Sequence, residues 1–204
     1  MNYRMIIYIM GQILRIVGLC MLLPIFVGII YSESHVAVTF GIPALITLLI
    51  SFIFTIKKPK NRSVYSMEGF VSVAASWITM SAIGALPFVI SGEIPNYIDA
   101  LFETVSGFTT TGSSILVDIE AMSSSLLYWR SFTHWVGGMG VLVFLLAIVP
   151  GGKKSDGFTM HLFRAESPGP EVGKLVPKLR QTALWLYGTY IVLSLLNFAF
   201  LMFG

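Results

Sequence analysis

The chain has few charged residues and few residues that could bind a metal or form a disulfide. Charged side chains make up 11% of its 204 residues, against about 25% in soluble domains. Its one cysteine, Cys20, excludes an intrachain disulfide and a multi-thiolate metal site. The three histidines lie far apart and lack metal-ligand spacing: His35, His134 and His161. These shortages exclude a disulfide framework and a thiolate metal site, and the histidines give no sign of a metal site.

Hydrophobic residues are abundant instead, at 55% of the chain, and the mean hydropathy is +0.82. A membrane-spanning helix needs about 20 predominantly apolar residues. Five segments meet this requirement, and we expect an all-α membrane protein with spans at Ile13–Tyr31, Val36–Ile56, Phe70–Ile90, Leu126–Val149 and Ala183–Phe203. The first is expected to be a span and not a signal peptide, because no small-residue cleavage site follows it.

The basic residues divide by side of the membrane. They fill the links between spans two and three and between spans four and five: Lys57, Lys58, Lys60 and Arg62, then Lys153, Lys154, Arg164, Lys174, Lys178 and Arg180. Cytoplasmic loops carry an excess of lysine and arginine. We therefore expect both links and the N-terminus, which carries Arg4, to be cytoplasmic.

Acidic residues gather on the opposite side: Glu33, Glu93, Asp99, Glu103, Asp118 and Glu120. Acidic residues contribute little to topology, so this clustering needs another reason. One hypothesis is an acidic vestibule that concentrates cations. The alternative is an ordinary solvated loop.

A polar stretch between spans three and four is the most informative part of the chain. Pro95-Asn96 predicts a turn, and 98–108 then reads as a short helix with Asp99 near its start. Eleven residues rise only about 16 Å, roughly half the hydrocarbon thickness. The helix should therefore enter the membrane, and the chain should return through Thr-Thr-Thr-Gly-Ser-Ser at 109–114.

Non-helical backbone survives at membrane depth only where protein buries it or water reaches it. Ion filters replace an ion's hydration shell with backbone carbonyls, and glycine adopts the required backbone angles readily. We therefore interpret the returning segment as one strand of a cation filter, formed by Thr109, Thr110, Thr111, Gly112 and Ser113. The alternative is an extracellular loop lying on the surface.

Two long motifs resemble a known family. Residues 102–112, Phe-Glu-Thr-Val-Ser-Gly-Phe-Thr-Thr-Thr-Gly, are similar to the first pore loop of the Trk/Ktr/HKT potassium transporters, in particular the TrkH branch. Residues 129–140, Trp-Arg-Ser-Phe-Thr-His-Trp-Val-Gly-Gly-Met-Gly, resemble the helix that follows it. Members of this family carry four helix–loop–helix repeats in one chain around one pore.

The resemblance implies a division into four parts. Residues 1–62 would hold two leading transmembrane helices and a basic cytoplasmic loop, and 63–150 the first helix–pore-loop–helix repeat. Residues 151–182 would be a cytoplasmic linker, and 183–204 the first helix of an incomplete second repeat. The chain is accordingly expected to be the N-terminal portion of a longer transporter, a truncated product or a fragment.

The resemblance also implies a function: potassium uptake across the bacterial inner membrane, with K⁺, or in some members Na⁺, as the transported ion. It places the ion on backbone oxygens of Thr110, Thr111 and Gly112, with Thr109 and Ser113 as weaker candidates. Potassium channels carry two filter glycines in Thr-Val-Gly-Tyr-Gly, whereas this segment has one. The resemblance further implies a cytosolic nucleotide-binding regulator of the TrkA/KtrA type and a homodimer of the full-length protein.

Arg130 is an arginine inside a span, which is costly unless it is paired. Glu103 on the short helix is the expected partner, in an ion pair that supports the filter; the alternative is that Arg130 snorkels to the surface. Gly137, Gly138 and Gly140 favour close helix packing over a flexible point. His134 is expected to be structural and not a proton relay.

Two other functions compete with an uptake permease: a small cation channel formed by a homotetramer, and a non-transporting remnant. No nucleophile elbow, acid–base pair or phosphate-binding loop appears, so the chain is not expected to be an enzyme. Neither a cofactor nor a nucleic-acid partner is expected.

Overall fold

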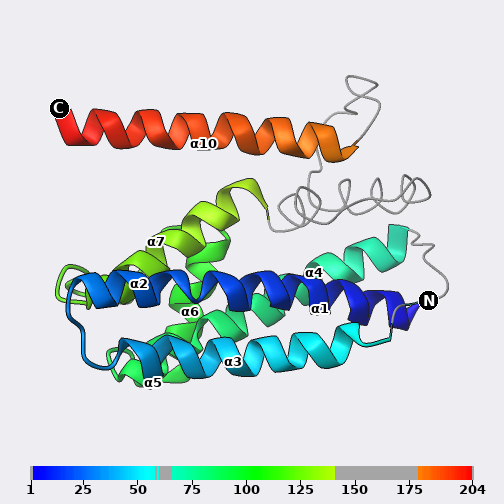
Figure 1. Cartoon of the computed structure of the whole chain (residues 1–204), viewed down its shortest axis with the longest axis horizontal. Helices are drawn as coiled ribbons and strands as arrows, with labels where there is room; N and C mark the ends of the chain where they lie inside the picture. The colour runs from blue at the N-terminus through cyan, green and yellow to red at the C-terminus, as the bar shows by residue number, and fades with distance from the viewer. Residues whose placement is uncertain (1, 58, 60–65, 141–178, 204) are drawn as a thin grey trace.

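The computed structural model describes residues 2–57, 59, 66–140 and 179–203, and within these residues all regular structure is helical (Figure 1). This agrees with the expected all-α class. The helices are α1 Tyr3–Cys20, α2 Leu23–Ile30, α3 Val36–Thr55, α4 Ser66–Gly84, α5 Leu86–Ser91, α6 Tyr97–Phe108, α7 Ser124–Met139 and α10 Leu179–Phe203.

Four of these helical stretches are long and apolar enough to cross a membrane: Tyr3–Ile30, Val36–Thr55, Gly69–Ser91 and Leu184–Phe203. The first begins ten residues before the predicted Ile13. The early turns were missed because Asn2, Arg4 and Gln12 dilute their hydrophobicity. Asn2 caps the helix through its side chain, and the turns bury Met5, Ile6 and Ile9.

The leading hairpin, α1–α2 followed by α3, is packed closely along its length. An added Cβ at Gly11, Gly18 or Gly28 would collide with α3 side chains, and the Ser51 hydroxyl donates to the Gly11 carbonyl at 2.7 Å. Arg15 lies well inside α1, next to the end of α3, where its guanidinium donates to Thr55 Oγ1 at 2.7 Å. It thus supplies a cation to the negative end of the α3 dipole.

Two of the three span prolines mark breaks between helices. Pro24 lies in the first turn of α2 and Pro87 in the first turn of α5, after the chain leaves α1 and α4. Proline is tolerated there because the first helical N–H groups have no intrahelical partner. Pro43 remains inside α3.

Helix α6 is short, as predicted. It runs over twelve residues, one more than expected, and so rises about 18 Å, too little to cross a hydrocarbon core of about 30 Å. The Asn96 side chain accepts a hydrogen bond from the Ile98 N–H at 2.9 Å. Asp99 lies in the first turn, where a carboxylate stabilises the helix dipole.

Helix α7 is shorter than the predicted span Leu126–Val149. It ends at Met139, and Gly140 follows with φ +79°, a conformation that glycine adopts at little cost. Residues 141–149 lie outside the described part of the chain, as do most of the proposed linker 151–182 and the boundary near residue 62.

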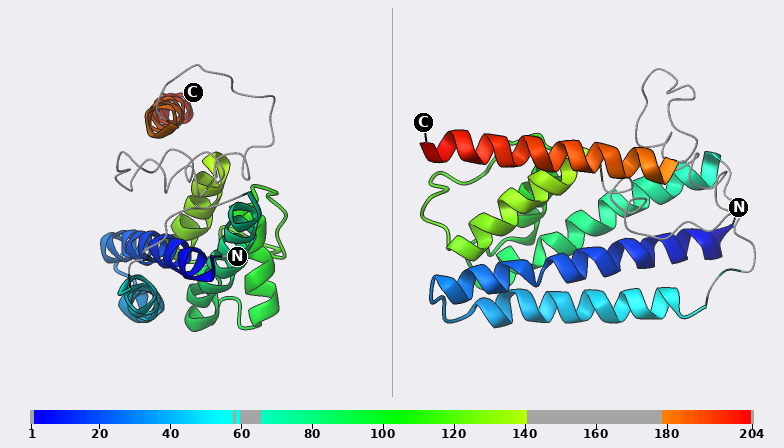
Figure 2. Two further views of the ribbon diagram at one scale, coloured as in Figure 1. Left: turned by 90° about the vertical axis from the view of Figure 1, so that its right-hand side faces the viewer. Right: turned by 45° about the horizontal axis from the view of Figure 1, so that its top comes forward.

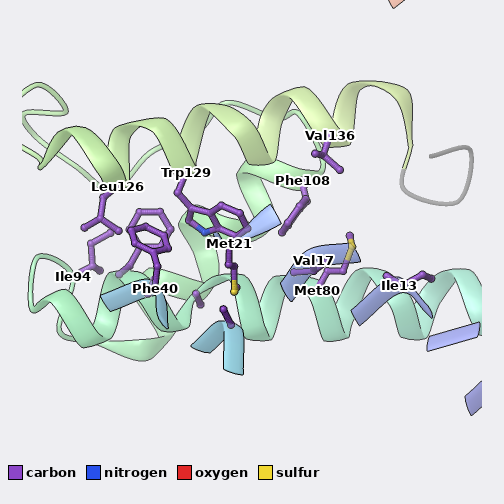
Figure 3. Close-up of a cluster of buried hydrophobic side chains, with 14 of the residues drawn as sticks. Ile13, Val17, Met21, Phe40, Met80, Ile94, Phe108, Leu126, Trp129 and Val136 are labelled. Atoms are coloured by element: carbon purple, nitrogen blue, oxygen red, sulfur yellow. The ribbon is translucent and has the colours of Figure 1, made fainter. Parts of the chain in front are cut away.

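One hydrophobic core joins the leading hairpin to α4–α7. It gathers buried side chains from α1, α3, α4, α6 and α7, among them Ile13, Phe40, Met80, Phe108 and Trp129 (Figure 3). Trp129 is central: its ring meets Phe40 edge-on, with centroids 6.2 Å apart, and its indole N–H donates to the Gly84 carbonyl at 3.0 Å. Helix α7 is thus fixed against both the hairpin and α4.

Helix α10 lies along the outside of this bundle (Figure 2). It meets α7 through Tyr190, whose hydroxyl donates to the Trp135 carbonyl at 3.1 Å, and Ser194, which accepts from the Trp135 indole at 3.1 Å. Most of its remaining side chains are exposed.

Candidate functional site

The loop after α6 begins with a left-handed turn. The Thr110 N–H bonds the Gly107 carbonyl at 2.9 Å and the Thr111 N–H bonds the Ser106 carbonyl at 3.0 Å, the pair of bonds that defines a Schellman motif. The left-handed residue of that motif is usually glycine. Here it is Thr110, with φ +56°, a rare conformation for a β-branched residue.

Gly112 is a second left-handed residue two positions later, with φ +77°. A Cβ added there would meet nothing within 4 Å. Glycine is therefore favoured at this position by the backbone angle and not by a lack of space. All five residues from Thr109 to Ser113 are exposed, and 111–116 form no regular structure. Within the described chain, the carbonyl oxygens of Thr110, Thr111 and Gly112 accept no hydrogen bond.

Side chains of α6 hold the loop from one side. The Ser106 hydroxyl donates to the Ser113 carbonyl at 2.5 Å. Glu103 Oε2 accepts from the Ser114 hydroxyl at 3.1 Å and from the Ile115 N–H at 3.2 Å. The loop is therefore anchored at its far end, where the Ser113 carbonyl is already engaged.

The same glutamate forms the ion pair expected from the sequence. Glu103 Oε1 lies 2.5 Å from Arg130 Nε, and the two side chains are 0% and 16% exposed. A buried charge needs a partner and further hydrogen bonds, and Glu103 has both. Arg130 points inward and does not snorkel to the surface.

Helices α6 and α7 touch backbone to backbone. A Cβ at Gly137 would collide with backbone atoms of Phe108, and one at Gly107 would collide with Thr133. Gly138 makes a similar approach to the Tyr190 hydroxyl. Gly137 and Gly138 therefore serve packing, as expected, whereas Gly140 ends the helix.

His134 has a structural partner. Its Nδ1 lies 2.9 Å from the Arg130 carbonyl oxygen. A carbonyl oxygen only accepts, so Nδ1 must carry the proton that it donates. This bond accounts for the position of the imidazole and agrees with the structural role expected for it.

Several carboxylates of the hypothesised acidic vestibule have hydrogen-bond or ion-pair partners within the chain. Glu103 is buried in its ion pair, and Asp118 accepts from the Glu120 N–H at 3.1 Å. Glu93 and Glu33 accept hydrogen bonds from backbone N–H groups at the start of α7. The sequence interpretation missed this last role, although the Ser-Ser-Leu-Leu start of α7 lacks any acidic residue of its own.

The comparisons with known proteins agree with this architecture. The model of the TrkH family, described as cation transport protein, matches residues 34–204. The TrkH potassium uptake protein of Salmonella typhimurium is 35% identical over 202 residues, which cover 95% of this chain and 40% of the relative. An uncharacterized cation transporter of Methanocaldococcus jannaschii is 31% identical, over 94% of this chain and 39% of its own length.

The fold is similar to that of a solved transporter. The crystal structure of the potassium transporter TrkH from Vibrio parahaemolyticus matches all of this chain and 40% of its own, with a TM-score of 0.78 and 28% identity. The chain thus spans about 40% of the length of these relatives. They are transporters, in agreement with the expectation that the chain is not an enzyme. The chain belongs to the TrkH family of cation transport proteins.

Proposed function

We propose that this chain contributes one wall of the ion pathway of a potassium uptake transporter. The backbone oxygens of Thr110, Thr111 and Gly112 are the K⁺ ligands in this proposal. The observation that carries it is a run of three exposed residues whose carbonyl oxygens accept no hydrogen bond within the described chain, in a loop with two left-handed residues at the end of a half-length helix. In an extended strand, successive carbonyls alternate in direction. Left-handed residues interrupt that alternation and allow neighbouring oxygens to face one ion.

The flanking residues have smaller roles. The Ser113 carbonyl already accepts a hydrogen bond from Ser106, which leaves it a weaker ion ligand. The Thr109 hydroxyl donates to the Val105 carbonyl at 2.7 Å and lies 2.8 Å from the Thr111 hydroxyl, so it braces the turn. Glu103, held by Arg130, supports the end of the loop through its hydrogen bonds to Ser114 and Ile115.

The proposal places the N-terminus and both basic links in the cytoplasm and the loop mouth outside, in a bacterial inner membrane. It also places the chain within a longer transporter, because the relatives carry the matching region in one longer polypeptide. In that setting, the helix–loop–helix repeat would recur around one pore. The homotetrameric channel is less favoured for the same reason, and the non-transporting remnant because the relatives are described as potassium transporters. A TrkA/KtrA-type regulator and a homodimer of the complete transporter belong to the proposal by family resemblance.

The test is a change of ion preference. Gly112→Ser in the complete transporter should alter the preference for rubidium, a potassium analogue, over sodium, because serine is strained in the left-handed region and should shift the backbone there. Gly188→Ser is the matched control: its site on α10 is equally open and lies outside the loop. Rubidium uptake by cells that lack their own potassium uptake is the measurement. Unaltered selectivity and affinity in Gly112→Ser would overturn the assignment.

A further inference from the structure

Two glutamates from separate loops meet the amino-terminal end of α7. Glu93 accepts from the Ser123 N–H, at 3.1 Å to Oε2 and 3.3 Å to Oε1, and Glu33 Oε1 accepts from the Ser125 N–H at 3.2 Å. The first N–H groups of a helix have no intrahelical partner. The Ser123 side chain makes no capping bond here. Loops distant in sequence therefore cap this helix.

Each glutamate directly follows a left-handed residue. Ser32 has φ +60° and Gly92 has φ +81°. At the end of α2, the Ser32 N–H bonds the Ile29 carbonyl at 3.2 Å and the Glu33 N–H bonds the Gly28 carbonyl at 2.8 Å, a Schellman motif with serine in the usual glycine position. Both turns end a helix and direct the next residue, a glutamate, toward α7.

The two glutamates also follow helices of similar design. Helices α2 and α5 are short, and they begin with Leu23-Pro24 and Leu86-Pro87 after a break in a longer span. Their ends lie at the same end of the molecule as the start of α7 (Figure 1). One belongs to the leading hairpin and the other to the helix–loop–helix unit.

A chain of contacts leads from these caps to the loop. Arg130 lies five residues after Ser125, about 7.5 Å along α7. Its Nε bonds Glu103, and Glu103 Oε2 bonds Ser114 and Ile115 at the end of the loop. The Phe108 backbone, just before the loop, also lies against Gly137 of α7. A shift of α7 along its axis would therefore move both ends of the loop.

We propose that Glu33 and Glu93 are positioning residues for the ion-contacting loop. Together they fix the height and tilt of α7, and through Arg130 and Glu103 they fix the loop. The leading hairpin, which lies outside the helix–loop–helix unit, thereby sets the geometry of that unit through Glu33. The link to ions rests on the proposed function, whereas the contacts themselves do not.

Hydrogen–deuterium exchange of the 204-residue chain in lipid nanodiscs tests the contacts. Glu93→Gln and Glu33→Gln should each speed exchange of the amides at 123–126 by about fivefold or more, because a charge-assisted bond is lost. The hydrogen-bonded loop amides of Thr111, Ile115 and Leu116 should also exchange faster, although neither glutamate touches them. Glu93 is exposed, so replacing it with glutamine does not disturb the hydrophobic core.

Glu120→Gln is the matched control, since Glu120 is an exposed acidic residue at the same end and its carboxylate has no partner in the described chain. It should leave both segments unchanged. Faster exchange at 123–126 with an unchanged loop would overturn the positioning role, and no change at either segment would overturn the caps as well. Both results would leave the proposed function standing, because exchange does not measure transport.

Rubidium uptake by the complete transporter separates positioning from simple loss of stability. Glu33→Gln and Glu93→Gln should raise KM about threefold or more while Vmax per inserted molecule changes little, because a displaced loop binds the ion less well. A fall in Vmax with unchanged KM would mean that the glutamates only hold the fold, and would overturn the proposal.

Discussion

At the residue scale, Thr110 and Gly112 both have a left-handed backbone, but this conformation strains the threonine and not the glycine. A β-branched residue in this conformation carries about 1–3 kcal/mol of backbone strain. The two Schellman bonds to the Gly107 and Ser106 carbonyls, together with the bond that anchors Ser113, hold Thr110 in the strained conformation. Such strain is concentrated at functional sites. In this loop it lies at and next to the carbonyls that accept no hydrogen bond within the described chain.

Gly112→Ala should lower the free energy of unfolding by about 1–2 kcal/mol, because alanine in the left-handed region is strained although the site is open. Gly41→Ala is the matched control. Gly41 is equally open but lies inside α3 without a positive φ, so alanine there should be neutral or stabilising by up to about 1 kcal/mol. Denaturant unfolding in mixed micelles measures both, and equal effects would contradict the strain argument.

The Glu103–Arg130 pair should show strong coupling. Removing one partner of a buried pair typically costs about 3–5 kcal/mol, and the low end applies here because Arg130 is 16% exposed. Glu103→Gln and Arg130→Gln combined should cost at least about 1 kcal/mol less than the sum of the single changes. A double-mutant cycle of unfolding free energies measures this, and simple additivity would show that the pair has no net interaction.

At the element scale, the contact between α6 and α7 depends on a glycine. Gly137→Ala should destabilise the protein by about 2 kcal/mol or more, because its Cβ would meet the Phe108 backbone, which cannot move aside cheaply. Gly188→Ala in α10 has open space and should be neutral. Thermal unfolding followed by circular dichroism compares the two variants. An unaffected Gly137→Ala protein would show that the two helices are not held as closely as described.

The elements also show which boundaries a sequence pattern determines. The start and length of α6 were predictable because Asn96 is a strong cap and Asp99 suits the first turn. The start of α1 was not, since its first turns mix polar residues with apolar ones that become buried only against other helices. The end of α7 at Gly140 was also missed, because a glycine in an apolar run fits both a packed helix and a broken one.

At the scale of the whole molecule, the proposed orientation in the membrane predicts which side chains can be labelled from outside the cell. In a Cys20→Ser background, Glu120→Cys should react with a membrane-impermeant maleimide in intact spheroplasts, whereas Lys57→Cys should react only after permeabilisation. Both side chains are exposed, and cytoplasmic loops carry the excess of basic residues. The reverse labelling pattern would invert the topology and place the loop mouth in the cytoplasm.

The sequence by itself determined the class of this protein. Its hydropathy and sparse charge required a membrane location, since about 20 apolar residues span a bilayer. The half-length helix followed by Thr-Thr-Thr-Gly located the candidate site, because polar backbone at membrane depth needs water or protein around it. Even the Glu103–Arg130 pair was foreseeable, since an arginine within a span requires a partner.

Only the tertiary structure decided how that site is held. The left-handed angle of Thr110 depends on anchors at both ends of the loop, and its residue type would not suggest it. Glu33 and Glu93 are 60 residues apart by their numbering, and nothing in their local sequence indicates that they cap the same helix. Such contacts arise because packing brings distant loops to one helix end, and local sequence patterns carry no record of that approach.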